Sequence, residues 1–279
     1  MFQEAFVRRP SVLLAALAAG AFSVSACGSS SSATPPAAGS STAASAGSAS
    51  SAPALRGTVV VFAAASLKES FTSLARKFEA VHPGVSVKIN FGGSDALAAS
   101  ITSGAPVDVF AAASTKTMSL VVRAGDGVGA PTPFARNELE IAVPPSNPRH
   151  IGALADTTKP GVKLVLCAAT VPCGAAAQKA YTAAGLSAHP VSLEQDVKSV
   201  LTKVELNEAD AGLVYQTDVK AAGTKVSGLN FPQAAKAITD YPIVAVKTGN
   251  NAAAGRLFIA YVLSPAGTEA LGAAGFLQP

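Results

Sequence analysis

The 279-residue sequence contains no tryptophan, few other aromatic residues and only 14% charged residues. Its lysines and arginines are scattered along the chain rather than gathered into one segment. A nucleic-acid-binding surface needs clustered positive charge and aromatic platforms on which bases can stack. The formal net charge of +4 therefore does not indicate a nucleic-acid partner.

Motifs of catalytic and nucleotide-binding proteins are missing as well. The sequence has neither the G-x-S-x-G elbow of serine hydrolases nor a GxxxxGK[ST] phosphate-binding loop. His82, His150 and His189 lie in turn-like stretches beside proline or glycine and show no metal-ligand spacing. We therefore expect no enzyme, no cofactor and no metal held directly by side chains. A serine hydrolase using Ser66 or Ser94 is the alternative from another class.

An apolar run lies close to the N-terminus, within residues 1–26. Arg8 and Arg9 precede the apolar run SVLLAALAAGAFSV (11–24), and the stretch VSAC follows at 24–27. A basic segment, a short apolar segment and small residues at the cut predict a secretory signal, since the apolar part is short for a permanent membrane span. VSAC resembles the lipobox of bacterial lipoproteins. We therefore predict lipidation at Cys27; an ordinary signal with an incidental cysteine is the alternative.

Residues 27–56 are dominated by serine, alanine, glycine and proline, with no charge before Arg56. Such a tract buries too little apolar surface to offset its conformational entropy, so it predicts a flexible tether. The remaining roughly 220 residues are long enough for one large domain or two lobes. No apolar run among them reaches transmembrane length.

Strand-like and helix-like patterns alternate along this remaining part. TVVVFAA (58–64) is a continuous apolar run, typical of a strand covered on both faces. Leu67, Phe71, Leu74 and Phe78 follow at steps of three and four, which predicts one face of a helix. The alternation restarts in the middle of the chain. It predicts an α/β fold of two lobes, with mostly parallel sheets and flanking helices.

Two helix predictions concern the second half of the chain. LEQDVKSVLTKVELNEA (193–209) carries apolar residues on one side and predicts a single amphipathic helix. Residues 251–276 predict two helices broken at Ser264 and Pro265. Proline at a first helical position, with serine before it, is a helix start signal.

Two serines stand where a strand pattern gives way to a helix pattern. Ser66 opens SLKE, whose spacing predicts a capping box with Glu69. Ser94 follows two glycines in FGGSDAL, and glycines let the backbone approach a bound group closely. Helix N-termini favour negative charge, so the pair indicates an anion site. We expect Asp95 to be an exposed first-turn residue, with contact to the ligand as the alternative.

Cys167 and Cys173 remain once Cys27 is assigned to the lipid. Two cysteines in an exported domain predict a structural disulfide, and a redox or metal-binding pair is the alternative. A third helix start falls near Cys173 and Gly174 in TVPCGAAA, which offers a further set of donors for an anion.

Five segments, taken together and in order, resemble the periplasmic molybdate-binding proteins, the solute receptors of ABC importers. They are VFAAASL, FGGSDALAASITSGAPVDVFAAAS, VPCGAAAQKA, EQDVKSVLTKVELNEADAGLVYQTD and YPIVAV, spread over nearly all of residues 57–279. The resemblance implies a type II periplasmic binding protein fold, and we expect crossings between its lobes near Asn137 and Asp240. The expected limits are 57–136 and 241–279 for lobe 1 and 137–240 for lobe 2.

The resemblance also implies which groups bind the anion. Hydroxyls would come from Ser66, Ser94 and Tyr215, and backbone amides from both serines, Cys173 and Val197. Neutral donors suit molybdate, which is fully deprotonated near neutral pH, whereas phosphate usually carries a proton and would need a carboxylate acceptor. A core tyrosine without a ligand is the alternative for Tyr215.

The same resemblance gives the expected partners. We expect molybdate and tungstate as ligands, ABC permease subunits as partners, and a monomer held outside the cell membrane by its lipid. A receptor of the same fold for sulfate, phosphate or another anion is the nearest alternative. A surface adhesin or scaffold would fit the tether but would leave the two serine-initiated helices unexplained.

Overall fold

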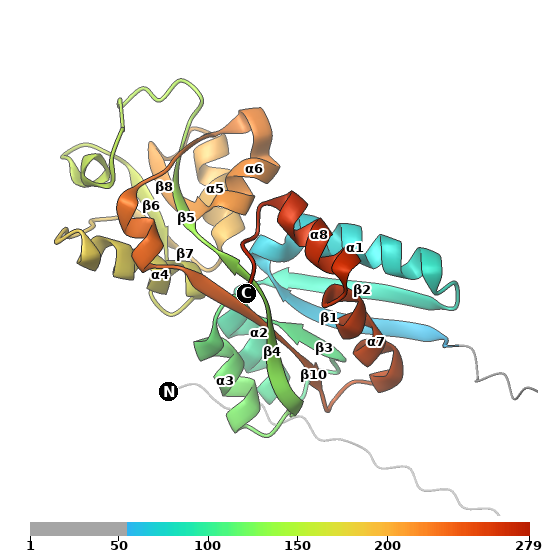
Figure 1. Cartoon of the computed structure of the whole chain (residues 1–279). Coiled ribbons are helices and arrows are strands. Elements are labelled where there is room, and N and C mark those ends of the chain that lie inside the picture. Colours follow the sequence, from blue (N-terminus) through green and yellow to red (C-terminus); the bar gives the residue numbers. More distant parts are fainter. Residues whose placement is uncertain (1–54) are drawn as a thin grey trace, which may run out of the picture. The chain divides into compact units, whose positions relative to one another are not determined.

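The computed structural model describes residues 55–279 (Figure 1). The predicted signal, Cys27 and nearly all of the predicted tether lie outside the described residues. The described part contains two five-stranded sheets with flanking helices. We call the first sheet with its helices lobe 1, and the second sheet with its helices lobe 2.

Lobe 1 is built on strands β1 (Gly57–Ala64), β2 (Val85–Gly92), β3 (Val109–Ala111), β4 (Gly127–Asn137) and β10 (Thr239–Val246). Their order in the sheet is β2-β1-β3-β10-β4. The first three are parallel, and β10 pairs antiparallel with both β3 and β4. Its helices are α1 (Lys68–Val81), α2 (Ser94–Thr102), α3 (Thr115–Arg123), α7 (Ala252–Val262) and α8 (Pro265–Ala274).

The helices of lobe 1 cover both faces of its sheet. Phe71, Leu74 and Phe78 of α1 form one hydrophobic cluster with residues of α7, α8 and β1, as the helical spacing predicted. Helices α2 and α3 close a second cluster with side chains of β3 and β10 (Figure 1). Burial on both faces accounts for the continuous apolar sequence of β1.

Lobe 2 contains strands β5 (Leu139–Val143), β6 (Leu164–Cys167), β7 (Ser192–Glu194), β8 (Ala211–Tyr215) and β9 (Ser227–Leu229). They follow the order β7-β6-β8-β5-β9. Its helices are α4 (Pro172–Ala183), α5 (Val197–Glu205) and α6 (Gln216–Ala222). A single hydrophobic cluster forms its core and also takes in Ala65 of lobe 1.

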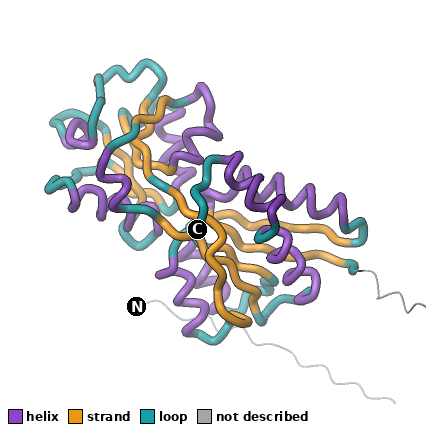
Figure 2. The backbone as a smooth tube through the Cα atoms, viewed as in Figure 1, coloured by secondary structure: helices purple, strands orange, loops and turns teal. Residues whose placement is uncertain are grey.

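The chain passes between the sheets twice (Figure 2). It leaves lobe 1 between Asn137 and Leu139 and returns between Leu229 and Thr239. The strands that follow these passages, β5 and β10, make only antiparallel pairings. Each sheet therefore combines parallel and antiparallel pairs, a more mixed arrangement than the mostly parallel one expected.

The two helix predictions of the second half had different outcomes. The break at Ser264 and Pro265 is confirmed, because the Ser264 side chain accepts from the Gly267 amide and caps α8. The single helix over 193–209 is wrong, since 192–194 is strand β7 and α5 begins only at Val197. No single helix within residues 55–279 is long and apolar enough to cross a membrane, although α7 and α8 qualify jointly across a 62° bend.

Candidate functional site

One small cavity lies between the lobes. It has a volume of about 20 Å³ and is lined from both sides by residues at the ends of strands and starts of helices. All five residues expected to bind the anion line it: Ser66, Ser94, Cys173, Val197 and Tyr215. A volume of this size accepts about one water molecule.

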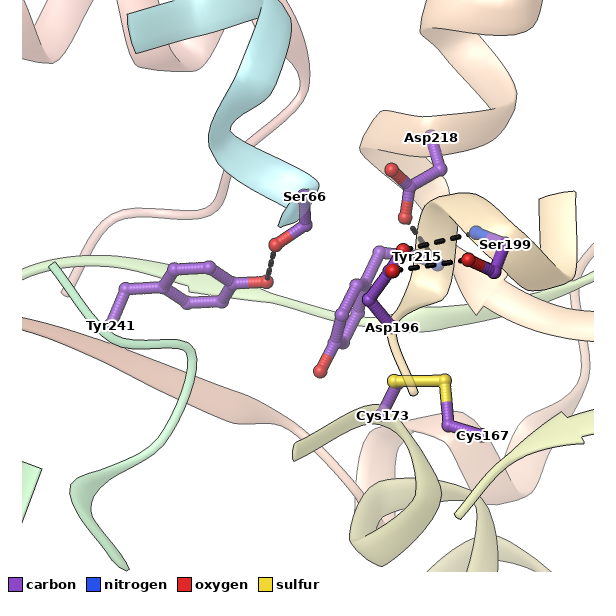
Figure 3. Close-up of a disulfide and its surroundings, with 8 residues drawn as sticks. All are labelled: Ser66, Cys167, Cys173, Asp196, Ser199, Tyr215, Asp218 and Tyr241. Atoms are coloured by element: carbon purple, nitrogen blue, oxygen red, sulfur yellow. Dashed lines mark hydrogen bonds between the residues drawn. A yellow bond between two sulfur atoms is a disulfide. The ribbon is translucent and has the colours of Figure 1, made fainter. Parts of the chain in front are cut away.

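Ser66 reaches the cavity from a short 3-10 segment, η1 (Ala65–Leu67), that joins β1 to α1. Its side chain makes no capping hydrogen bond, so the capping box expected with Glu69 is wrong. The Oγ atom lies instead 2.8 Å from the Tyr241 hydroxyl (Figure 3). The Glu69 carboxylate forms an ion pair with Lys198 of lobe 2. Contacts far apart in the chain thus override the local capping pattern.

Ser94 is the first residue of α2 and is almost fully buried. Its Oγ accepts a hydrogen bond of 3.0 Å from the Ala113 amide, two residues after the end of strand β3. Because the amide donates, the Ser94 hydroxyl keeps its own proton for another acceptor. The amide of Ser94 has no partner within its helix either, since first-turn amides of an α-helix lack one.

Lobe 2 contributes two helix starts. Cys173 is in the first turn of α4 and is joined by a disulfide to Cys167 at the end of β6, with a Cα–Cα distance of 5.7 Å (Figure 3). The predicted disulfide is therefore confirmed. Gly174 lies so close to the Ala168 carbonyl that a Cβ atom would overlap it. The bridge and this close approach fix the loop that presents the Cys173 amide to the cavity.

Val197 is the first residue of α5, and Asp196 is its N-cap. Asp196 also lines the cavity, but one carboxylate oxygen accepts from the Ser199 amide and the other from the Ser199 hydroxyl (Figure 3). Its charge therefore compensates the helix N-terminus. The amide of Val197 has no partner within the helix, and this leaves a backbone donor at the cavity wall.

Tyr215, the last residue of β8, is only 1% exposed. Its hydroxyl is shielded from solvent and has no hydrogen-bond partner in the part of the chain that the structure describes. Burial raises the pKa of this hydroxyl above its ordinary value, so the group stays a neutral donor. A buried hydroxyl without a partner is costly. At the wall of a cavity, such a hydroxyl is available to donate to a group inside it.

A second tyrosine at the site was not singled out from the sequence. Tyr241 on β10 is fully buried, and its ring stands edge-on to Tyr215 with centroids 6.1 Å apart. Besides Ser66, its hydroxyl meets the Asn137 side chain, at a long 3.5 Å. The segment YPIVAV contained this residue, but a tyrosine at the start of a buried strand carries no signal that separates packing from function.

The remaining polar candidates lie outside the cavity. Asp95 is half-buried rather than exposed as expected, and it does not line the cavity. None of the three histidines lines it, and neither serine there is bonded to a base. No group of three or more His, Cys, Asp or Glu residues that could hold a metal ion occurs within residues 55–279. The arrangement offers hydrogen-bond donors and no general base.

Comparisons with known proteins agree with this geometry. A family model described as "Bacterial extracellular solute-binding protein" matches residues 59–277. The molybdate-binding protein ModA of Mycobacterium tuberculosis is 43% identical over 222 residues, which is 80% of this chain and 85% of that protein.

Two solved structures share the fold. The periplasmic molybdate-binding protein of Azotobacter vinelandii matches with a TM-score of 0.70 and 20% identity, over 79% of this chain and 99% of that one. The sulfate-binding protein SubI of Mycobacterium tuberculosis also gives 0.70, at 17% identity, over 78% and 86%. These confirm the two-lobed type II solute-binding fold. By sequence and by fold, the chain belongs to the bacterial extracellular solute-binding protein family.

Proposed function

We propose that this protein is a receptor for a fully deprotonated tetrahedral oxyanion, and that this oxyanion is molybdate. One observation carries the proposal: Ser66, Ser94, Tyr215 and first-turn residues of α2, α4 and α5 line the same interlobe cavity, and its lining among residues 55–279 includes no Lys, Arg or His. Within residues 55–279 the one charged residue in this wall is Asp196, whose two carboxylate oxygens accept from the Ser199 amide and hydroxyl.

The ligand groups follow from this wall. Ser66, Ser94 and Tyr215 give hydroxyl donors, and the amides of Ser66, Ser94, Cys173 and Val197 give backbone donors. Each hydrogen bond to a charged group contributes about 1.5–3 kcal/mol, so several of them bind a dianion without a buried cation. A ligand that carries a proton needs an acceptor, and the one carboxylate in the wall, that of Asp196, already accepts twice from Ser199. This favours molybdate over phosphate.

We assign molybdate rather than sulfate as the ligand because of the relatives. The Mycobacterium tuberculosis ModA is similar over most of the chain, whereas the likeness to the sulfate-binding protein SubI concerns the fold. Tungstate, with nearly the same size and charge as molybdate, is a second ligand. A receptor for sulfate or another tetrahedral anion is the alternative, because hydrogen-bond type alone does not separate two deprotonated dianions.

Binding requires the lobes to open and close. We place the hinge at the two passages of the chain between the sheets, near Asn137 and near Asp240. The limits of lobe 2 lie just inside the expected 137–240, because β4 of lobe 1 extends to Asn137 and β10 of lobe 1 begins at Thr239. The small volume of the cavity supports a closed arrangement of the described residues. The loaded receptor would pass its ligand to ABC permease subunits. It would act as a monomer attached to the outer side of the cell membrane through lipidated Cys27.

Calorimetric titration of the purified protein with molybdate, tungstate, sulfate and phosphate, in separate runs, tests the proposal. We expect tight one-to-one binding of molybdate and tungstate and much weaker binding of the other two anions. Tighter binding of sulfate or phosphate would keep the receptor but change its ligand. No binding of any of the four would refute an inorganic oxyanion receptor.

A further inference from the structure

We propose that Tyr241 is a positioning residue for the oxyanion: its hydroxyl donates to Ser66 and thereby turns the Ser66 proton into the cavity. The inference rests on the proposed function, because it assigns a direction to a hydrogen bond next to the proposed ligand. It adds a residue that does not line the cavity, and it explains how the hydroxyl of Ser66 is held as a donor.

The Tyr241 hydroxyl is fixed in place by the packing of its ring. The side chain is fully buried. Its ring makes edge contacts with Phe134, Tyr215 and Phe276, at centroid distances of 6.2, 6.1 and 5.4 Å. Aromatic rings packed edge to face keep a defined geometry. The 2.8 Å contact with Ser66 is therefore held by the surrounding core rather than by the serine alone (Figure 3).

The side-chain amide of Asn137 determines whether Tyr241 or Ser66 donates the hydrogen bond between them. The Asn137 Oδ1 atom accepts from the Glu138 amide at 3.0 Å, so its Nδ2 atom faces the Thr217 hydroxyl, at 2.8 Å, and the Tyr241 hydroxyl, at 3.5 Å. An amide NH₂ group only donates. The Tyr241 oxygen is thus the acceptor on this side, and its own proton is left for Ser66.

The opposite direction leaves a proton without a partner. If Ser66 donated to Tyr241, the Tyr241 proton would need another acceptor. The NH₂ group of Asn137 has no lone pair to receive it, and the Tyr241 hydroxyl has no hydrogen-bond partner among residues 55–279 besides Ser66 and Asn137. The lone pairs of Ser66 would then face the anion and repel it. Burial raises the pKa of Tyr241 well above its ordinary value, so the hydroxyl retains the proton that it donates.

At Ser94 the direction of the corresponding hydrogen bond is fixed, because its partner is a backbone amide. Its oxygen accepts from the Ala113 amide, a group that only donates, so its proton is free for the cavity. Each serine thus has an acceptor site filled by the protein and its proton available to the ligand. Hydrogen bonds in such a chain polarise one another, which strengthens the final donor.

A double-mutant cycle of Tyr241→Phe and Ser66→Ala, read by calorimetric titration with molybdate, tests the inference. Tyr241→Phe keeps the ring and removes the hydroxyl, and we expect about a tenfold loss of affinity. Ser66→Ala should lose about thirtyfold. The double variant should bind no more weakly than Ser66→Ala, because the Tyr241 hydroxyl acts only through Ser66.

Tyr181→Phe is the matched control. It also removes a buried tyrosine hydroxyl bonded to another hydroxyl, that of Thr157 at 2.6 Å, but within the core of lobe 2. We expect unchanged molybdate affinity for this variant. A Tyr241→Phe variant with wild-type affinity, or one equally damaging with and without the Ser66 hydroxyl, would overturn the positioning role while leaving the receptor intact.

Neutron diffraction of the deuterated molybdate complex gives the same answer without a substitution. The deuteron between the two hydroxyls should lie on the Tyr241 oxygen, and a deuteron on Ser66 directed at Tyr241 would overturn the inference. Failure of the wild-type protein to bind molybdate or tungstate would overturn the proposed function, and the inference with it. The two failures are therefore distinguishable.

Discussion

The ammonium group of Lys198, in α5 of lobe 2, lies 2.8 Å from the carboxylate of Glu69, in α1 of lobe 1. The same group is 2.9 Å from the fully buried Asp218, whose other oxygen accepts from the Tyr215 amide. Burial lowers the pKa of Lys198, but Asp218 and Glu69 raise it more, so the pKa stands above its ordinary value. Among residues 55–279 this is the only ion pair between the lobes.

Removing the carboxylate of Glu69 should therefore favour the open form. We expect Glu69→Gln to release labelled molybdate about threefold faster, with little change in the association rate, because a partly exposed pair contributes up to about 1 kcal/mol. Glu205→Gln is the control, since its 3.9 Å pair with Lys225 lies within lobe 2. A dissociation rate equal to wild type would show that the ion pair does not stabilise the closed form.

Gly93 of lobe 1 lines the cavity and lies against residues of lobe 2. A Cβ atom there would overlap the Gln195 carbonyl of lobe 2, although the backbone φ of −60° suits alanine. Gly93→Ala should therefore leave the ligand-free protein equally stable and weaken molybdate binding by more than about tenfold, by hindering closure. Gly272→Ala, in open space on α8, should leave the affinity unchanged and raise stability by about 0.5–1 kcal/mol, as alanine does in place of a helical glycine. Calorimetry gives both readings, and a Gly93→Ala variant of full affinity would contradict the expected closure.

The unpartnered hydroxyl of Tyr215 predicts opposite effects on stability and binding. Tyr215→Phe removes a buried group without a partner, so the ligand-free protein should unfold at the same temperature or higher. Molybdate affinity should fall about thirtyfold. Tyr181→Phe, which loses a bond to Thr157, should show the reverse: stability lower by about 1 kcal/mol and unchanged affinity. Scanning calorimetry and titration of both variants measure this; a Tyr215→Phe variant that lost stability but not affinity would assign the hydroxyl to packing.

The pH dependence of binding follows from the two tyrosines. Burial raises the pKa of both Tyr215 and Tyr241 above the ordinary value of 10.0. The folded state therefore keeps both hydroxyls protonated up to and above about pH 10. The stability and the hydrogen-bond donation that they contribute are lost only as the pH rises further. Molybdate affinity should therefore be constant from about pH 7 to about pH 10. A decline with a midpoint within this range, seen by titration calorimetry at several pH values, would contradict the neutral-donor site.

The disulfide should stabilise lobe 2 and its donor loop. Closing so short a loop between Cys167 and Cys173 contributes about 2 kcal/mol. The double variant Cys167→Ala and Cys173→Ala should unfold at a lower temperature and bind molybdate several-fold more weakly, because the amide of residue 173 is held less firmly. Thermal unfolding of the wild type with and without reductant is the matched comparison. Equal unfolding temperatures in both comparisons would mean that the bridge adds nothing to the fold.

Local sequence patterns predicted many elements because short-range geometry determines them. The β-branched run of β1, the spacing of the apolar residues in α1 and the start of α8 at Pro265 all depend on neighbours along the chain. Strand β4 gave no such signal, since its segment GVGAPTPFARN contains two prolines and two glycines. It is an edge strand, where proline is tolerated because one side of the ladder needs no partner.

Local patterns of burial and of helix initiation placed Ser66, Ser94, Cys173 and Tyr215 at strand ends and helix starts. They did not place Val197 there, because the start of α5 was missed. The meeting of all five residues at one cavity, and the partners of their hydroxyls, were decided by the tertiary structure alone. Ser66 meets Tyr241 across 175 positions, and Glu69 meets Lys198 across 129. A capping pattern of four residues carries no information about such distant groups. The first contact forms when β10 joins the sheet of lobe 1, the second when the two lobes meet, and both replace the local bonds that the sequence predicts.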